Sequence, residues 1–296
     1  ALDWMSDPNL AVGDRDSLLT EAEQEAVQAL QLDSTNTLAL AYYAEILVDE
    51  QKWVQAESNI SEAVNRDPES MDVRRINGYM LESVGNYSQA ISEYQAAIHI
   101  NPNLTFIYLR IGANYRTLQN SDMALEYFDK AATINEQLGV QDSVPYFSIA
   151  TTYTPLGEFL VASTNALKGL NFDPGNADMY GRLGIVYHKS RNYEGAIPAF
   201  KCALEGCTAE ESCEVRQCDS TTDEMVSVEG LPLSNSTVDY YLTYGSVLAG
   251  MHRTVNGYCE DAMRILKMVR EAYSNDAVVM STLNESVAIC NSYGYR

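Results

Sequence analysis

The residues of this chain most capable of chemistry are six cysteines, all in its last third. Four surround an irregular segment and two follow in helical patterns: Cys202, Cys207, Cys213, Cys218, Cys259 and Cys290. An even number concentrated where the pattern is least regular is typical of a disulfide framework that stabilises a long loop. We expect Cys259 to pair with Cys290, because both lie on segments predicted to be neighbouring helices. The other four allow three connectivities, and the sequence does not choose among them.

The alternatives for these cysteines are free thiols and a zinc site. Zinc is disfavoured because the spacings are wider than those of the usual metal fingers and no histidine lies near the first four cysteines. Disulfides form in oxidising compartments, so the expected location is extracellular or at the cell surface.

Five Asn-X-Ser/Thr triplets are compatible with N-glycosylation in the same compartment. They begin at Asn59, Asn86, Asn103, Asn235 and Asn284. Asn86, Asn103 and Asn235 fall where the helix pattern predicts turns or loops, so we expect these three to be modified first. The alternative is that all five are ordinary surface asparagines.

The sequence contains no recognisable catalytic motif. It lacks a glycine-rich phosphate loop, a His-Glu-x-x-His helix and a Gly-x-Ser-x-Gly elbow. His99, His188 and His252 are scattered without ligand or triad spacing. We therefore expect a protein that is not an enzyme and that has no metal or cofactor.

The composition of the chain disfavours two kinds of environment, a membrane interior and nucleic acid. Hydrophobic residues make up 46% of the chain, without an uninterrupted apolar run near 18 residues, so we expect no membrane-spanning helix. The formal net charge of −22 argues against nucleic acid, which requires clustered lysine and arginine.

The elements that position these residues follow a repeat of about 34 residues. Its units begin at Thr37, Met71, Thr105, Ser143 and Ala177. The eighth position is always small, as expected where two helices cross closely: Ala44, Gly78, Gly112, Ala150 and Gly184. The twentieth position is always alanine: Ala56, Ala90, Ala124, Ala162 and Ala196.

This register resembles the tetratricopeptide repeat family over roughly residues 14 to 295. The resemblance implies an all-α, right-handed superhelical solenoid of tetratricopeptide-type helical hairpins. It also implies a protein that binds other proteins, often along the concave surface lined by the first helix of each hairpin. Applied to this chain, the family register gives a mostly apolar partner groove containing Leu38, Tyr79, Phe106, Leu109, Phe147 and Ile185. The alternative is that tight superhelical winding buries some of these positions.

The predicted organisation has six parts. These are an extended arm over 1–13, a half-repeat helix over 14–36, five repeats over 37–207, a Cys-rich insertion loop over 208–237, a degenerate sixth repeat over 238–276, and an orphan or capping helix over 277–296.

The two ends of this organisation suggest self-assembly. A chain that starts with a second helix and ends with a first helix presents complementary surfaces, so copies can join head to tail into a filament. The residues expected to mediate this contact are Trp4, Met5, Leu10, Met280 and Val287. The expected function is an extracellular structural glycoprotein that binds copies of itself end to end and carries possible glycans. The alternative is a peptide-binding adaptor that uses the concave groove, with the last helix serving only as a cap.

Overall fold

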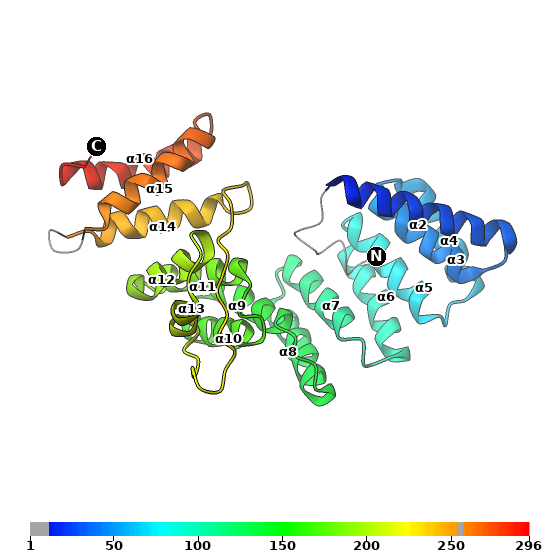
Figure 1. The fold of residues 1–296 in the computed structure, drawn as a ribbon. Coiled ribbons are helices and arrows are strands. Elements are labelled where there is room, and N and C mark those ends of the chain that lie inside the picture. The colour runs from blue at the N-terminus through cyan, green and yellow to red at the C-terminus, as the bar shows by residue number, and fades with distance from the viewer. Residues whose placement is uncertain (1–11, 254–256, 296) are drawn as a thin grey trace. The chain divides into compact units, whose positions relative to one another are not determined.

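The computed structural model describes residues 12–253 and 257–295, with side chains from residue 17 onward. The expected all-α helical repeat fold is confirmed. Within the described ranges there is no β-strand, only an isolated bridge between Cys207 and Val228. The helices, shown in Figure 1, are α2 (Val12–Leu32), α3 (Thr37–Asp49), α4 (Trp53–Arg66), α5 (Met71–Ser83), α6 (Tyr87–Ile100), α7 (Thr105–Thr117), α8 (Ser121–Leu138), α9 (Val144–Leu156), α10 (Phe159–Phe172), α11 (Ala177–Lys189), α12 (Tyr193–Leu204), α13 (Ala209–Arg216), α14 (Val238–Met251), α15 (Cys259–Ala272) and α16 (Ala277–Ser292).

The chain divides into two compact units, with the boundary inside α8 between Ile134 and Asn135. In the first unit, α2 packs on α3, and the pairs α3/α4 and α5/α6 form helical hairpins. The second unit contains the hairpins α9/α10, α11/α12 and α14/α15, and α16 packs on α14 and α15. Candidate sites are therefore located within each unit separately.

The small residues of the repeat are explained by rings that lie against them. A Cβ atom on Gly78 would come within 2.7 Å of the Tyr94 ring, and one on Gly184 within 2.7 Å of the Phe200 ring. Any side chain there would force the two helices of the hairpin apart, so the crossing requires glycine. The alanines at the twentieth position are fully buried at the same interfaces: Ala56, Ala90, Ala124, Ala162 and Ala196.

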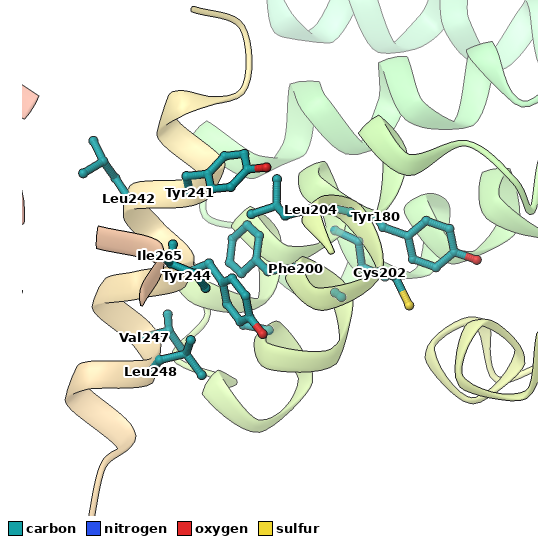
Figure 2. Close-up of a cluster of buried hydrophobic side chains, with 14 of the residues drawn as sticks. Tyr180, Phe200, Cys202, Leu204, Tyr241, Leu242, Tyr244, Val247, Leu248 and Ile265 are labelled. Carbon is teal, nitrogen blue, oxygen red and sulfur yellow. The ribbon is translucent and has the colours of Figure 1, made fainter. Parts of the chain in front are cut away.

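The largest core belongs to the second unit and crosses the insertion. Figure 2 shows Phe200 of α12 beside Tyr244 of α14, with the two ring centroids 5.9 Å apart. Leu248 and Ile265 are buried in the same cluster. Since α12 packs directly on α14, the residues inserted between them leave this part of the helix stack continuous.

The insertion is more ordered than the expected loop over 208–237, because it contains helix α13. A capping box starts this helix: the backbone N–H of Glu211 donates to the Thr208 hydroxyl, and the Glu211 carboxylate accepts from the Thr208 N–H. The spacing Thr-x-x-Glu is a sequence signal for that cap. The helix ends at Arg216, which is 2% exposed and donates to the Glu224 carbonyl at 2.7 Å.

Four of the predicted repeat starts are the first residues of helices α3, α5, α7 and α11: Thr37, Met71, Thr105 and Ala177. Helix α2 begins at Val12, inside the predicted arm over 1–13. Trp4, Met5 and Leu10 lie outside the described residues.

Candidate functional site

A network of hydrogen bonds and ion pairs, called the polar ladder below, joins the first helices α3, α5 and α7 of the first unit. Its residues are Glu45, Asp49, Arg75, Tyr79, Glu82, Arg110 and Asn114. On its first rung, the guanidinium of Arg75 in α5 donates to both carboxylate oxygens of Glu45 in α3, at 2.7 and 2.9 Å, and both residues are buried. Burial lowers the pKa of Arg75, but the hydrogen bonds and charge of Glu45 outweigh it and raise the value. The hydroxyl of Tyr79 donates to Asp49 at 2.6 Å one turn further on.

A second rung connects α5 to α7. Glu82 accepts hydrogen bonds from Arg110, Asn114 and Tyr94 at 3.0, 3.0 and 2.8 Å. The Arg110 guanidinium also lies 5.5 Å from the centroid of the Tyr79 ring. Burial is the main cause that raises the pKa of Tyr79, followed by its hydrogen bond to Asp49. The charged groups of the ladder thus satisfy one another.

This ladder corrects the expected apolar groove in the first unit. Tyr79 is half-buried and bonded to Asp49. Leu38 and Phe106 are 45% and 39% exposed on the first turns of α3 and α7, whereas Leu109 packs on the core. The predicted groove residues of this unit therefore do not form a continuous apolar surface, because ion pairs connect the helices that carry them.

The second unit contains an apolar cavity of about 330 Å³ between α9 and α11. Its apolar lining includes Phe147 and Ala150 of α9, Ala166 of α10, and Ile185 and Val186 of α11. The prediction for Phe147 is partly wrong, because its side chain is 6% exposed and its ring packs against Gly169. Phe147 belongs mainly to the core and contributes to one wall of the cavity, whereas Ile185 remains half-buried.

Polar groups lie at the rim of this cavity. Arg182 forms an ion pair with Asp178 at 2.6 Å, and Asp178 also accepts from the Tyr240 hydroxyl at 2.9 Å. Burial, followed by the charge of Asp178, raises the pKa of Tyr240. Lys189 is exposed and has no ion-pair partner among the residues that the structure describes. The cavity therefore combines an apolar interior with a positively charged edge.

All six cysteines are at disulfide distance in three pairs. Cys202 lies next to Cys207 and Cys213 next to Cys218, with Cα atoms 4.7 and 5.0 Å apart. Cys259 of α15 pairs with Cys290 of α16, with Cα atoms 5.4 Å apart, which is the pair favoured by the sequence. Of the three connectivities left open, the structure has the one that joins nearest neighbours.

The five asparagine triplets occupy different environments. Asn86, Asn103 and Asn235 are exposed in the turns or loops before α6, α7 and α14. Asn59 is half-buried within α4, and Asn284 is exposed within α16. Accessibility thus agrees with the expected order for the three loop sites, while their modification stays a prediction.

The two predicted assembly residues of the last helix differ in burial, since Val287 is buried and Met280 is half-buried. Val287 is 9% exposed and belongs to the core of the second unit, and Met280 packs against that core. The prediction that Val287 is a docking residue is wrong, because its side chain faces the rest of its own unit. The exposed apolar residues of this end are Val278, Ile289 and Tyr293.

His252 and His188 have packing contacts, whereas His99 is exposed. The backbone N–H of Cys259 donates to Nδ1 of His252, which is buried, and the ring of His188 lies near that of Tyr193. Within the described ranges, no group of three or more His, Cys, Asp or Glu side chains is arranged to hold a metal ion. No described helix is long and apolar enough to cross a membrane.

Comparison with known proteins adds independent evidence on the family. The tetratricopeptide repeat family model matches residues 107–138 and 177–205, which correspond to the hairpins α7/α8 and α11/α12. The same register extends over the other hairpins. The chain therefore contains tetratricopeptide repeats. The match supports a role of these repeats as a scaffold for protein–protein interaction.

Several solved structures share the fold, and the first two below are tetratricopeptide repeat proteins. One from Parabacteroides merdae is 17% identical, with 93% of each chain covered and a TM-score of 0.57. The C-terminal part of another from Cytophaga hutchinsonii is 16% identical, with 91% of this chain and 96% of that one covered and a TM-score of 0.61. The type IV pilus biogenesis factor PilW is 14% identical, with 85% and 99% covered and a TM-score of 0.62.

One curated relative has a similar sequence. The DnaJ homolog subfamily C member 7 homolog of Dictyostelium discoideum is 20% identical over 180 residues, which cover 57% of this chain. The chain spans about a third of the length of that relative, since 33% of the relative is covered.

Sequence reasoning missed the pairing of side chains in the polar ladder and the rim of the cavity. Glu45 and Arg75, like Asp49 and Tyr79, are 30 positions apart, which is one repeat minus one helical turn. That offset brings side chains of successive first helices together, so it was an available signal. Tyr240 has no comparable signal, because the insertion interrupts the register before α14.

Proposed function

We propose that this repeat protein is an adaptor that binds an extended peptide segment in the cavity between α9 and α11. The observation that carries the proposal is an apolar cavity edged by cationic groups. Burying a large apolar side chain there contributes roughly 25 cal/mol per Å² removed from water. The positive charge of Lys189 favours an acidic residue in the bound peptide, because opposite charges are placed against each other at protein interfaces. The expected segment therefore carries a large apolar residue next to Asp or Glu.

The second unit is preferred over the first for a physical reason. The ladder of Glu45, Arg75, Glu82 and Arg110 already pairs its own charges across the first helices. A ligand on that face would have to break these contacts and leave buried charges unpaired, which is costly.

An array of short peptides probed with the labelled protein tests the adaptor. We expect bound sequences to be enriched in an aromatic or large aliphatic residue beside an acidic one. Lys189→Glu should select against acidic neighbours, and Ile185→Asp should abolish binding. Leu160→Asp is the matched control, because Leu160 is 81% exposed in the same unit and outside the cavity. Binding unchanged by both cavity variants would refute the proposed site.

The location outside the reducing cytoplasm is part of the proposal and rests on the three cysteine pairs. Non-reducing peptide mapping of protein isolated without reductant should recover all three cross-linked peptide pairs. Six alkylatable thiols would contradict it. Intact-mass measurement before and after glycosidase treatment tests whether the loop asparagines carry sugar.

End-to-end assembly is a second candidate function, favoured by the incomplete burial of the small residues of α2. This helix carries small residues at the positions of a second helix, Ala22, Ala26 and Ala29, and each remains half-buried although α2 packs on α3. A helix from another copy would cover them. Light scattering at several protein concentrations should then show assemblies that dissociate on dilution and that Ala26→Glu abolishes. A monomer at every concentration would refute assembly and leave the adaptor.

A further inference from the structure

The first unit contains a second cavity, of about 550 Å³, in the groove between α4 and α6. The C-terminal half of α5 forms its floor, where Leu81 lies. Thirteen residues line it, and seven of them are polar. This groove lies between second helices, so it is separate from the ladder along α3, α5 and α7.

The repeat register explains why this groove is open. In the next groove along the unit, between α6 and α8, Tyr115 stacks on Tyr127 with ring centroids 5.6 Å apart. Gln95 donates to the Tyr127 hydroxyl at 2.9 Å. One repeat earlier, the same three register positions are occupied by Leu81, Glu93 and Ser61. Replacing two rings and an amide with these smaller groups leaves the space empty.

The lining has an aromatic ring and unused hydrogen-bonding groups. Trp53 is 37% exposed. The side chains of Ser61, Asn77 and Gln89 make no hydrogen bond within the part of the chain that the structure describes. No lysine or arginine lines the cavity. Of its two carboxylates, Glu93 is paired with Arg74 at 2.9 Å, and Glu57 is exposed without an ion-pair partner among the described residues.

We propose that this groove binds a neutral pyranose sugar. One face of a pyranose carries C–H groups, which are attracted to the negative face of an indole ring. Its rim carries hydroxyls that both donate and accept, which matches the neutral amide and hydroxyl groups around Trp53. An anionic ligand lacks a cationic partner in the lining, and a purely apolar side chain would leave the polar groups without partners.

Two other ligand sources are separated by experiment. A quaternary ammonium could lie over Trp53 near Glu57, since cations bind aromatic faces. The same pyranose chemistry could also come from a glycan on Asn86, which lines the groove and begins an Asn-X-Ser triplet.

The test uses protein made in bacteria, which carries no N-glycan, with the substitution Trp4→Phe. Trp53 is then the only tryptophan, because the chain has two. Titration with chitotriose, cellotriose and maltotriose should produce a saturable change in Trp53 fluorescence with at least one of them. Choline chloride should produce none. No response to any saccharide overturns the proposal, and a response to choline alone replaces the sugar with a cationic ligand.

Variants taken from the chain's own repeats locate the site. Leu81→Tyr introduces the residue that the next repeat has at the same position, Tyr115, so its ring should fill the groove. It should weaken saccharide binding by at least about tenfold, or about 1.4 kcal/mol. Gln89→Ala, an exposed position, should weaken it without affecting the fold. The matched control Tyr115→Leu opens the neighbouring groove and should leave Trp53 binding unchanged. Full affinity in both Leu81→Tyr and Gln89→Ala would overturn the assignment.

Protein from a glycosylating host distinguishes the source of the sugar. If a glycan on Asn86 occupies the groove, removal by peptide-N-glycosidase should change Trp53 fluorescence and then permit titration. If the ligand is a free saccharide, the titration should be the same before and after treatment.

Discussion

The buried ion pair between Arg75 and Glu45 supports a prediction whose size follows from the structure. Its two side chains are 9% and 6% exposed and meet through two hydrogen bonds. Glu45→Gln removes the counter-charge and leaves a guanidinium in a low-dielectric interior. Breaking such a pair from one side costs about 3 to 5 kcal/mol. Asp72 lies 3.7 Å from Arg75 and is more exposed, so it compensates only in part.

The double variant Glu45→Met with Arg75→Met should behave differently. Replacing both charges with apolar groups of similar length removes the desolvation cost together with the attraction, so its stability should lie near or above that of the parent. Urea unfolding followed by Trp53 fluorescence, in the Trp4→Phe background, reports on the first unit. A double variant that loses as much stability as Glu45→Met and Arg75→Met added together would refute the reasoning, because additive losses would mean that the two side chains are not coupled.

Three other predictions concern separate features. Burial raises the pKa of Asp49 in the folded state above its ordinary value of 3.8. Its contribution to stability is therefore present below pH 3.8 and is lost as pH rises through the folded-state pKa, so the melting temperature of Asp49→Asn relative to the parent should rise as pH increases above 3.8. Ala124→Leu should cost about 1 to 3 kcal/mol in urea unfolding, because Ala124 is fully buried at a helix crossing; an unchanged midpoint would contradict the crossing. Replacing Cys259 and Cys290 with serine should lower the stability of the second unit by about 4 kcal/mol for a loop of this length, measured by hydrogen exchange in α14 to α16.

The repeat could be predicted from the sequence because its signal is steric and local. Gly78 and Gly184 leave room for the rings of Tyr94 and Phe200, and such positions recur at a fixed interval. The exposure of a single residue was less predictable. Val287 was interpreted as exposed because α16 carries apolar residues around much of its circumference, but its orientation depends on packing against α14. Phe147 was placed in a groove, although the absence of a side chain at Gly169 allows its ring to turn inward.

The candidate sites followed from departures from the repeat rather than from the repeat itself. Leu81, Glu93 and Ser61 open one groove where Tyr115, Tyr127 and Gln95 close the next. These residues are visible in the sequence, but their common effect appears only when the helices that carry them are adjacent. A family register therefore predicts where helices cross, and the deviations from it indicate where a ligand has room.

The same logic applies to the last helix. Counted from Ala277, the eighth position of α16 is Asn284, where complete hairpins have glycine or alanine. At Gly78 even a single Cβ atom would come within 2.7 Å of the ring on the second helix. Asn284 is exposed, and its longer side chain stands where a following helix would cross. A further helix with a large residue at that crossing cannot pack on α16 as the earlier second helices do. Any copy that docks there must present a small residue, and Ala26 of α2 occupies the corresponding position.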